Sequence, residues 1–153
     1  MARRTLVAAF SAALLLGVPA IASAQDPAAA VAQKPDQYVF TQDSLMMGFT
    51  IAEAGAPEFE KFIAKVKETL PKSEKPERKQ QAESWRLMKL ETPPQGGNVS
   101  YFLVLEKVVK GASYDLFKIL SEGLPPAEVQ AIYDKVFPHI KAGISFTPIR
   151  FIG

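Results

Sequence analysis

The sequence has 153 residues, with 18 basic and 16 acidic side chains, one histidine and no cysteine. The absence of cysteine excludes disulfides, thiol catalysis and cysteine-ligated zinc. The single histidine, His139, cannot by itself build a histidine-rich transition-metal site. We therefore expect neither a bound metal nor another cofactor.

Residues 1–24 are typical of a cleavable secretory signal peptide. Arg3 and Arg4 give a basic start, and residues 6–18 form an apolar stretch. Residues 22–24 (ASA) then match the small residues that signal peptidase accepts. The apolar stretch is shorter than the roughly 20 residues that cross a bilayer comfortably. We expect an exported protein, located in the periplasm or outside the cell, with no stable membrane insertion after cleavage.

Cleavage after Ala24 removes the charge imbalance of the full sequence. The loss of Arg3 and Arg4 lowers the basic residues from 18 to 16, which equals the 16 acidic residues. A neutral domain has no general attraction for nucleic acid. We therefore expect no nucleic-acid partner.

The folded domain is predicted to span residues 44–153, after a flexible leader in residues 25–43 that is rich in alanine, proline and glutamine. Residues 44–51 are a short apolar run typical of a strand. The next apolar residues recur at helical spacing, which predicts a helix that begins near Pro57 and stops at Pro71. These apolar residues are Phe59, Phe62, Ile63, Val66 and Leu70.

The middle of the domain is predicted to be a charged loop and a hairpin. Residues 72–81 carry charges of both signs and are interpreted as a solvated loop. Residues 85–90 and 99–108 are apolar runs typical of strands. The turn-forming residues 93–98 between them indicate a hairpin with a longer loop.

The last third is predicted to hold two helical segments and a strand. Apolar side chains recur at spacings of three in residues 114–120 and form a wide stripe in residues 126–140. Gly143 is placed as the C-terminal cap of the second segment. Residues 144–152 are interpreted as a final strand, which Pro148 limits to a sheet edge or a break.

The resulting order, β-α-β-β-α-β with a broken second helix, predicts an α+β domain that resembles the ferredoxin-like fold. In that fold an antiparallel sheet carries its helices on one face. The chain is also similar to the dimeric α/β-barrel superfamily over residues 44–152, through segments 58–70, 76–86 and 99–107. This resemblance implies ferredoxin-like protomers that pair through their sheets.

Both faces of the predicted hairpin are apolar, because side chains alternate along a strand. Trp85, Leu87, Tyr101, Leu103 and Leu105 oppose Met88, Leu90, Phe102 and Val104. A second apolar face left in water would form a patch that soluble monomers seldom tolerate. At ~25 cal/mol per Å2, covering four or five such side chains is worth roughly 10 kcal/mol. We therefore expect a homodimer that packs sheet against sheet.

Four residues are candidates for ligand binding. Trp85, Tyr101 and Tyr114 either are large core residues or line a pocket between the sheet and the helices. His139 either acts as an axial haem ligand or general base, or caps the carbonyls at a helix end. No pattern identifies a catalytic residue.

Two functional hypotheses follow, because the superfamily hosts many activities and its fold constrains function weakly. Its members include cofactor-independent monooxygenases, haem-degrading and haem-binding enzymes, muconolactone isomerases and stress-response proteins. The first hypothesis is an exported homodimeric module without catalytic activity, which binds a small apolar ligand or has a structural role. The alternative is a small enzyme, monooxygenase-like or haem-related, that acts on a hydrophobic substrate near Trp85 and Tyr101.

Overall fold

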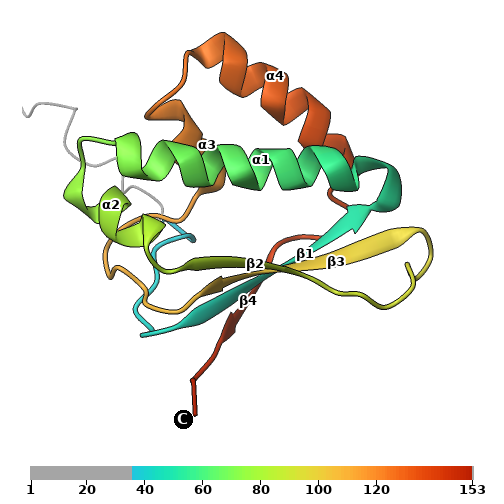
Figure 1. Cartoon of the computed structure of the whole chain (residues 1–153), viewed down its shortest axis with the longest axis horizontal. Coiled ribbons are helices and arrows are strands. Elements are labelled where there is room, and N and C mark those ends of the chain that lie inside the picture. Colours follow the sequence, from blue (N-terminus) through green and yellow to red (C-terminus); the bar gives the residue numbers. More distant parts are fainter. Residues whose placement is uncertain (1–35, 153) are drawn as a thin grey trace, which may run out of the picture. The chain divides into compact units, whose positions relative to one another are not determined.

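Four strands form one antiparallel sheet in the structure, a computed structural model that describes residues 36–152 (Figure 1). The predicted signal peptide lies outside the described residues. The strands are β1 (Leu45–Ala52), β2 (Trp85–Lys89), β3 (Asn98–Leu105) and β4 (Ser145–Pro148). Their order in the sheet is β2-β3-β1-β4, so the two longest strands lie in the centre and the two shortest at the edges.

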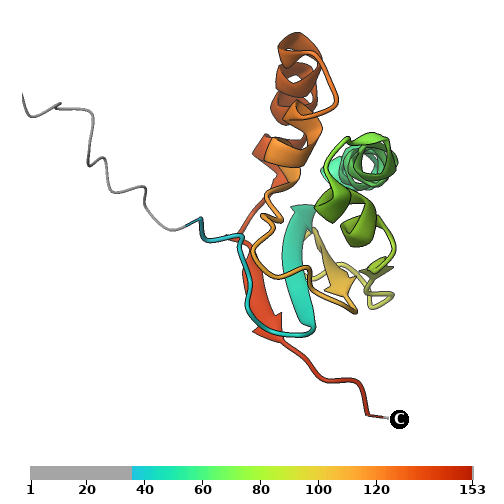
Figure 2. The same ribbon diagram turned by 90° about the vertical axis from the view of Figure 1, so that its left-hand side faces the viewer.

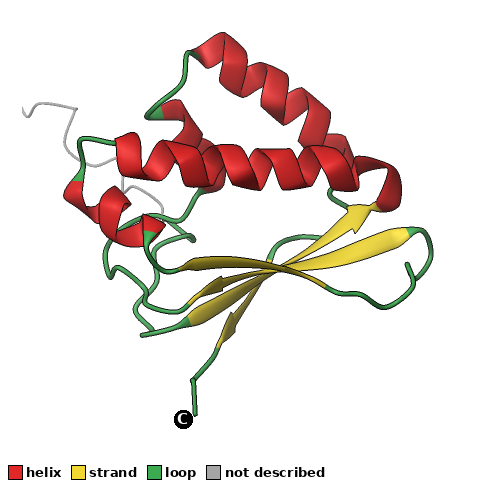
Figure 3. Cartoon of the chain, in the orientation of Figure 1, coloured by secondary structure: helices red, strands yellow, loops and turns green. Residues whose placement is uncertain are grey.

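All described helices lie on one face of this sheet (Figures 1 and 2). They are α1 (Ala56–Thr69), α2 (Pro76–Ala82), α3 (Leu116–Ser121) and α4 (Pro126–Val136), with short 3-10 turns between several elements (Figure 3). The architecture is therefore α+β, as predicted. Within residues 36–152, none of these helices is long and apolar enough to cross a membrane.

The core lies between the helices and the inner face of the sheet. In β1 the side chains of Leu45, Met47, Phe49 and Ile51 are buried, and in β3 those of Val99, Tyr101, Leu103 and Leu105. The register pairs these residues across the two strands, for example Met47 with Leu103. Helix α1 closes the core with the apolar stripe that predicted it, from Phe59 to Val66.

The opposite surface of the sheet, which we call the outer face, carries a second set of apolar side chains. Its members are Met46, Met88, Leu90, Phe102 and Val104, which alternate with the core residues along the strands. The exposed fractions of Met88 and Leu90 are 47% and 45%. The predicted two apolar faces of the hairpin are thus present.

The predicted solvated loop in residues 72–81 is wrong over its second half. Pro76 begins helix α2, and two of the helix's polar side chains, Arg78 and Gln81, are buried. They stay buried because Arg78 Nη1 donates to Gln81 Oε1 at 2.7 Å and Gln81 Nε2 donates to the carbonyl of Ser113 at 3.2 Å. Polar residues that satisfy one another in this way give no apolar stripe in the sequence.

The predicted end of the last helix is also wrong. Helix α4 ends at Val136 and a 3-10 turn, Phe137–His139, follows it. Pro138 explains the early end, because its ring removes a backbone N–H and clashes with the preceding turn of a helix. Gly143 consequently lies in the loop before β4 instead of capping a helix. Strand β4 is shorter than the predicted 144–152.

Residues 36–43 fall within the predicted leader, and in the structure they pack on the domain. Phe40 is buried, with its ring centroid 5.7 Å from that of Tyr114 and 5.2 Å from that of Phe146. The amide of Tyr114 donates to the carbonyl of Tyr38 at 2.8 Å. The folded unit therefore begins several residues before the predicted boundary at residue 44.

Candidate ligand-binding site

A cleft of about 780 Å3 opens between the C-terminal end of α4, the segment that leads into β4, and the first described residues of the chain. Five aromatic side chains line it: Tyr38, Phe117, Tyr133, Phe137 and Phe146. We call this space the aromatic cleft. Its volume falls in the range of roughly 300–1,000 Å3 that is usual for small-molecule sites.

Three of these rings form a continuous series of ring contacts that reaches the core. Tyr133 and Phe137 lie one helical turn apart, with ring centroids 4.6 Å apart and planes 16° from parallel. Phe117 of α3 meets Tyr133 nearly edge-on at 5.1 Å. On its other side Phe117 stacks on buried Phe62 of α1 at 4.8 Å. Each ring is therefore held by a neighbour, so this wall of the cleft is formed before any ligand arrives.

The other two rings come from the ends of the described chain. Tyr38 and Phe146 meet edge to face, with centroids 5.8 Å apart. The loop between α4 and β4 is fixed to the sheet, because the amide of Lys141 donates to the carbonyl of Thr50 at 2.9 Å. Ile140 also forms an isolated bridge with Ile51. These contacts position the loop residues that complete the cleft.

Two charged residues, Asp115 and Lys141, interrupt the apolar lining. Asp115 caps helix α3, since its Oδ1 accepts hydrogen bonds from the amides of Phe117 at 3.0 Å and Lys118 at 3.1 Å. Lys141 Nζ lies 3.4 Å from the carbonyl of Pro138 and forms no ion pair with another residue of the 36–152 range. An apolar lining with few polar groups is what small-molecule sites use to hold and orient a ligand.

Trp85 and Tyr114, two of the predicted ligand-binding residues, stack on each other inside the core. Their ring centroids are 6.3 Å apart and both side chains are buried. The Tyr114 hydroxyl accepts a hydrogen bond from the amide of Val109 at 2.7 Å, and burial raises the pKa of this phenol. The indole N–H of Trp85 has no hydrogen-bond partner among the described residues.

Tyr101 is buried elsewhere in the same core. Its ring centroid lies 5.0 Å from that of Phe59, and its hydroxyl donates to Glu60 Oε1 at 2.6 Å. Burial, together with the hydrogen bond to the Glu60 carboxylate, raises the pKa of Tyr101. Lys89 Nζ also reaches Glu60 Oε1 at 3.0 Å. These contacts pin the start of α1 to the sheet.

His139 lies in the 3-10 turn after α4, where its side chain is half-buried. It packs against Gly55, and a Cβ added at Gly55 would collide with Cβ and Cγ of His139. None of Trp85, Tyr101, Tyr114 and His139 lines the aromatic cleft. Their predicted role in ligand binding stays a prediction.

The rings of the cleft were only partly recognisable in the sequence. Phe117, Tyr133 and Phe137 belong to the predicted apolar stripes, and the spacing of four between Tyr133 and Phe137 places two aromatic rings on one helix face. Nothing in that pattern distinguishes a stripe facing the core from one facing a cleft. Tyr38 falls in the predicted leader, so no periodic signal marks it.

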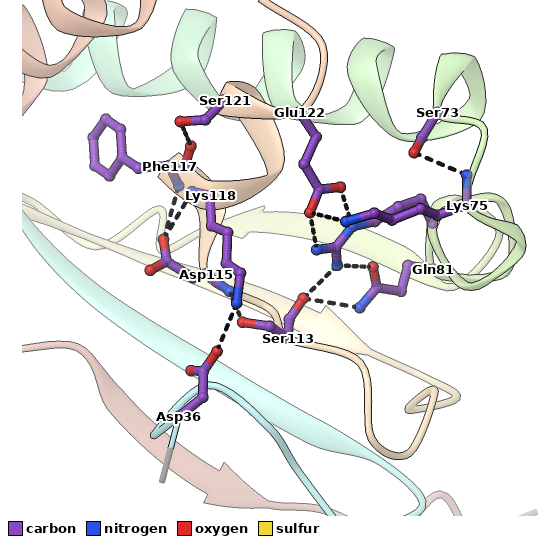
Figure 4. A network of polar contacts seen from close by, with 11 residues as sticks. Asp36, Ser73, Lys75, Gln81, Ser113, Asp115, Phe117, Lys118, Ser121 and Glu122 are labelled. Atoms are coloured by element: carbon purple, nitrogen blue, oxygen red, sulfur yellow. Dashed lines mark hydrogen bonds and ion pairs between the residues drawn. The ribbon is translucent and has the colours of Figure 1, made fainter. Parts of the chain in front are cut away.

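A polar cluster joins α2 to the end of α3 (Figure 4). Arg78 Nε and Nη2 donate to the two carboxylate oxygens of Glu122, both at 2.8 Å, and Lys75 Nζ reaches Glu122 Oε1 at 2.8 Å. Mainly because of the Arg78 hydrogen bonds, the pKa of Glu122 falls from 4.5 to about 2. Glu122 in turn raises the pKa of Arg78. Arg78 and Glu122 are thus bound to each other across the two segments, and this pair holds α2 to the end of α3.

Residues 36–152 contain no group of three or more histidine, aspartate or glutamate side chains that could hold a metal ion. Comparison with known proteins gives no match: no family model fits the sequence, and no curated protein or solved structure is significantly similar to it.

Proposed function

We propose that this protein is an exported homodimeric module that binds a small apolar molecule in the aromatic cleft. The observation that carries the proposal is the set of five aromatic rings around about 780 Å3 of space. Phe137 is 53% exposed although it is large and apolar. Exposed apolar side chains grouped in a concave surface are a feature of ligand-binding sites.

A flat, largely aromatic molecule fits this lining best. Tyr133 and Phe137 are stacked with their planes almost parallel, and the flat ring of a ligand would extend this stack. Stacked or edge-to-face aromatic contacts each contribute about 0.5–1.5 kcal/mol beyond the burial of area. Export is supported by the signal-peptide pattern of residues 1–24.

The topology supports a ferredoxin-like fold as the scaffold of this module. The strand order β2-β3-β1-β4, with antiparallel neighbours and all described helices on one face, is the arrangement expected for two interleaved β-α-β units. We extend the proposal to the dimeric α/β-barrel superfamily, in which such sheets pair. The additional helix α2 and the break between α3 and α4 are then insertions in this scaffold.

Pairing through the outer face is supported by its apolar character. Phe102 packs over Gly48 at the centre of the sheet, where glycine has no side chain that would displace the ring. A second copy would cover Met88 and Leu90, which are otherwise about half exposed. An isologous two-fold interface would bring each copy's apolar patch against the same patch of the other.

Ligand binding is tested with 2-naphthol as the probe, by calorimetry and by the probe's fluorescence. We expect the wild-type protein to bind it, and Phe137→Ala to weaken binding about tenfold, which corresponds to about 1.4 kcal/mol. Gly143→Phe should weaken binding, because Gly143 lines the cleft and the space around it is open to a larger side chain.

The matched control for the cleft is Phe151→Ala, a phenylalanine of similar exposure that does not line it. This variant should bind 2-naphthol as the wild-type protein does. Absence of binding by the wild-type protein, or equal weakening in the Phe137 and Phe151 variants, would contradict the proposal.

Pairing of protomers is measured separately, by sedimentation velocity over a concentration series. Met88→Asp should shift the population from dimer to monomer, because it places a charge on the outer face. Phe137→Asp, an equally exposed apolar site on the helix side of the sheet, should not. A wild-type protein that stays monomeric at all concentrations would contradict pairing and leave the ligand-binding proposal standing.

A further inference from the structure

The last described residues leave the sheet on the side of the outer face. The amide of Ile149 donates to the carbonyl of Ser44 at 3.3 Å. Among the described residues, this is the last backbone hydrogen bond between this segment and the rest of the domain. Residues 150–152, which we call the C-terminal tail, then extend away from the sheet and from the helices (Figures 1 and 2). Phe151 is 57% exposed and Ile152 is 95% exposed.

The outer face alone offers little surface for a stable dimer. Strands spaced ~4.8 Å apart that rise ~3.3 Å per residue give this sheet a flat footprint of roughly 400 Å2. A standard protein–protein interface buries about 800 Å2 on each partner. The C-terminal tail carries further exposed apolar side chains on the same side of the sheet, and these would enlarge an interface formed through the outer face.

The described part of the tail is long enough to reach a facing sheet. Two sheets that pack face to face lie about 10 Å apart. Three extended residues span about 10 Å as well. In Figure 2 the segment after β4 runs away from the helices, so a tail of this length can contact a sheet that faces the outer face.

We propose that the C-terminal tail of each protomer lies on the outer face of a second copy, with the two tails exchanged about a two-fold axis. Phe151 and Ile152 then cover the partner's exposed methionine and leucine side chains. In return, the partner covers the tail, whose two apolar side chains are otherwise in water. This inference rests on the proposed pairing through the outer face and adds the segment that completes the interface.

The first test compares dimer dissociation constants, measured by sedimentation velocity on protein expressed from the full-length sequence. We expect Phe151→Asp and a chain that ends at Ile149 each to raise the dissociation constant at least tenfold. Phe137→Asp should leave it unchanged. A dimer that persists unweakened in both tail variants overturns the role of the tail, whereas a monomeric wild-type protein overturns the pairing itself.

The second test locates the tail with a disulfide, which is specific because the native chain has no cysteine. We expect a variant with Met88→Cys and Ile152→Cys to form a covalent dimer on mild oxidation, visible on non-reducing gels. Each single-cysteine variant serves as a control for links between identical positions. A disulfide within one chain, which would place the tail on its own sheet, overturns the inference. A yield of dimer no higher than in the controls overturns it too.

Discussion

Arg78 and Glu122 form a bidentate ion pair, in which Arg78 Nε and Nη2 each lie 2.8 Å from a different carboxylate oxygen of Glu122. The Arg78 side chain is only 4% exposed, and the Glu122 side chain is 16% exposed. Parallel bonds of this kind fix geometry as well as charge. The pair connects α2 to the end of α3, and α3 supplies Phe117 to the aromatic cleft.

Glu122→Gln should lower the free energy of unfolding by about 2–3 kcal/mol. Removing one partner of a buried ion pair leaves the other charge uncompensated, which costs about 3–5 kcal/mol when burial is complete. We expect less here, because Lys75 reaches the same carboxylate from solvent. Urea unfolding measures the change. Glu74→Gln is the control, since Glu74 is an exposed neighbour without an ion pair among the described residues, and a loss as large in that variant would contradict the prediction.

The stability of the protein should fall between about pH 5 and pH 2 because of this same carboxylate. The pKa of Glu122 is about 2 in the folded protein and 4.5 in the unfolded chain. Between these values the unfolded chain binds more protons than the folded protein does. The contribution of Glu122 to the free energy of unfolding is therefore fully present above the unfolded pKa, and it is lost as pH falls toward 2. Unfolding free energies measured across this interval should decline less steeply for Glu122→Gln than for the wild-type protein. Parallel pH profiles for the two proteins would contradict this assignment.

The first strand and the first helix could be predicted because their apolar residues follow simple patterns. The continuous apolar run of residues 44–51 predicted β1, the stripe from Phe59 to Val66 predicted α1, and both match the structure. Helix α2 could not be predicted in this way. Its buried residues are Arg78 and Gln81, which enter the core only because Glu122 and Ser113 satisfy their hydrogen bonds, and such partners lie more than 30 residues away in the sequence.

The position of the aromatic cleft could not be predicted from the sequence. Trp85 and Tyr101 were expected either to be core residues or to line a pocket; both are buried in the core, their part in ligand binding stays a prediction, and the aromatic cleft lies near Tyr133 and Phe137. Large aromatic residues satisfy the same sequence pattern in both settings. Which of them faces a cavity depends on Pro138, which ends α4 early and leaves the following loop to frame the cleft.

Tyr101→Phe should lower the free energy of unfolding by about 1 kcal/mol and leave 2-naphthol binding unchanged. The substitution keeps the ring against Phe59 and removes only the hydrogen bond to Glu60, whose carboxylate remains hydrated and paired with Lys89. A net hydrogen bond is worth about 1 kcal/mol. Chemical denaturation and calorimetry of the same sample provide both values. A loss of probe binding without a loss of stability would instead place Tyr101 in a ligand site.

Gly55→Ala should lower the free energy of unfolding by about 1–3 kcal/mol, because its new methyl group collides with His139 and forces it to move. The backbone of Gly55, at φ −96° and ψ −3°, is accessible to alanine, so the collision alone causes the loss. In a protein that already carries His139→Ala, where Cγ and the ring are absent, the same Gly55→Ala substitution should cost less.

The difference between these two costs is the coupling free energy of the two positions, which a double-mutant cycle measures by urea unfolding. Gly143→Ala provides the control, since a Cβ at Gly143 meets no atom within 4 Å and should not lower stability. Equal costs of Gly55→Ala in the two backgrounds would show that the His139 ring contributes nothing to the collision. A substantial coupling would identify His139 as a packing residue between the end of α4 and the start of α1.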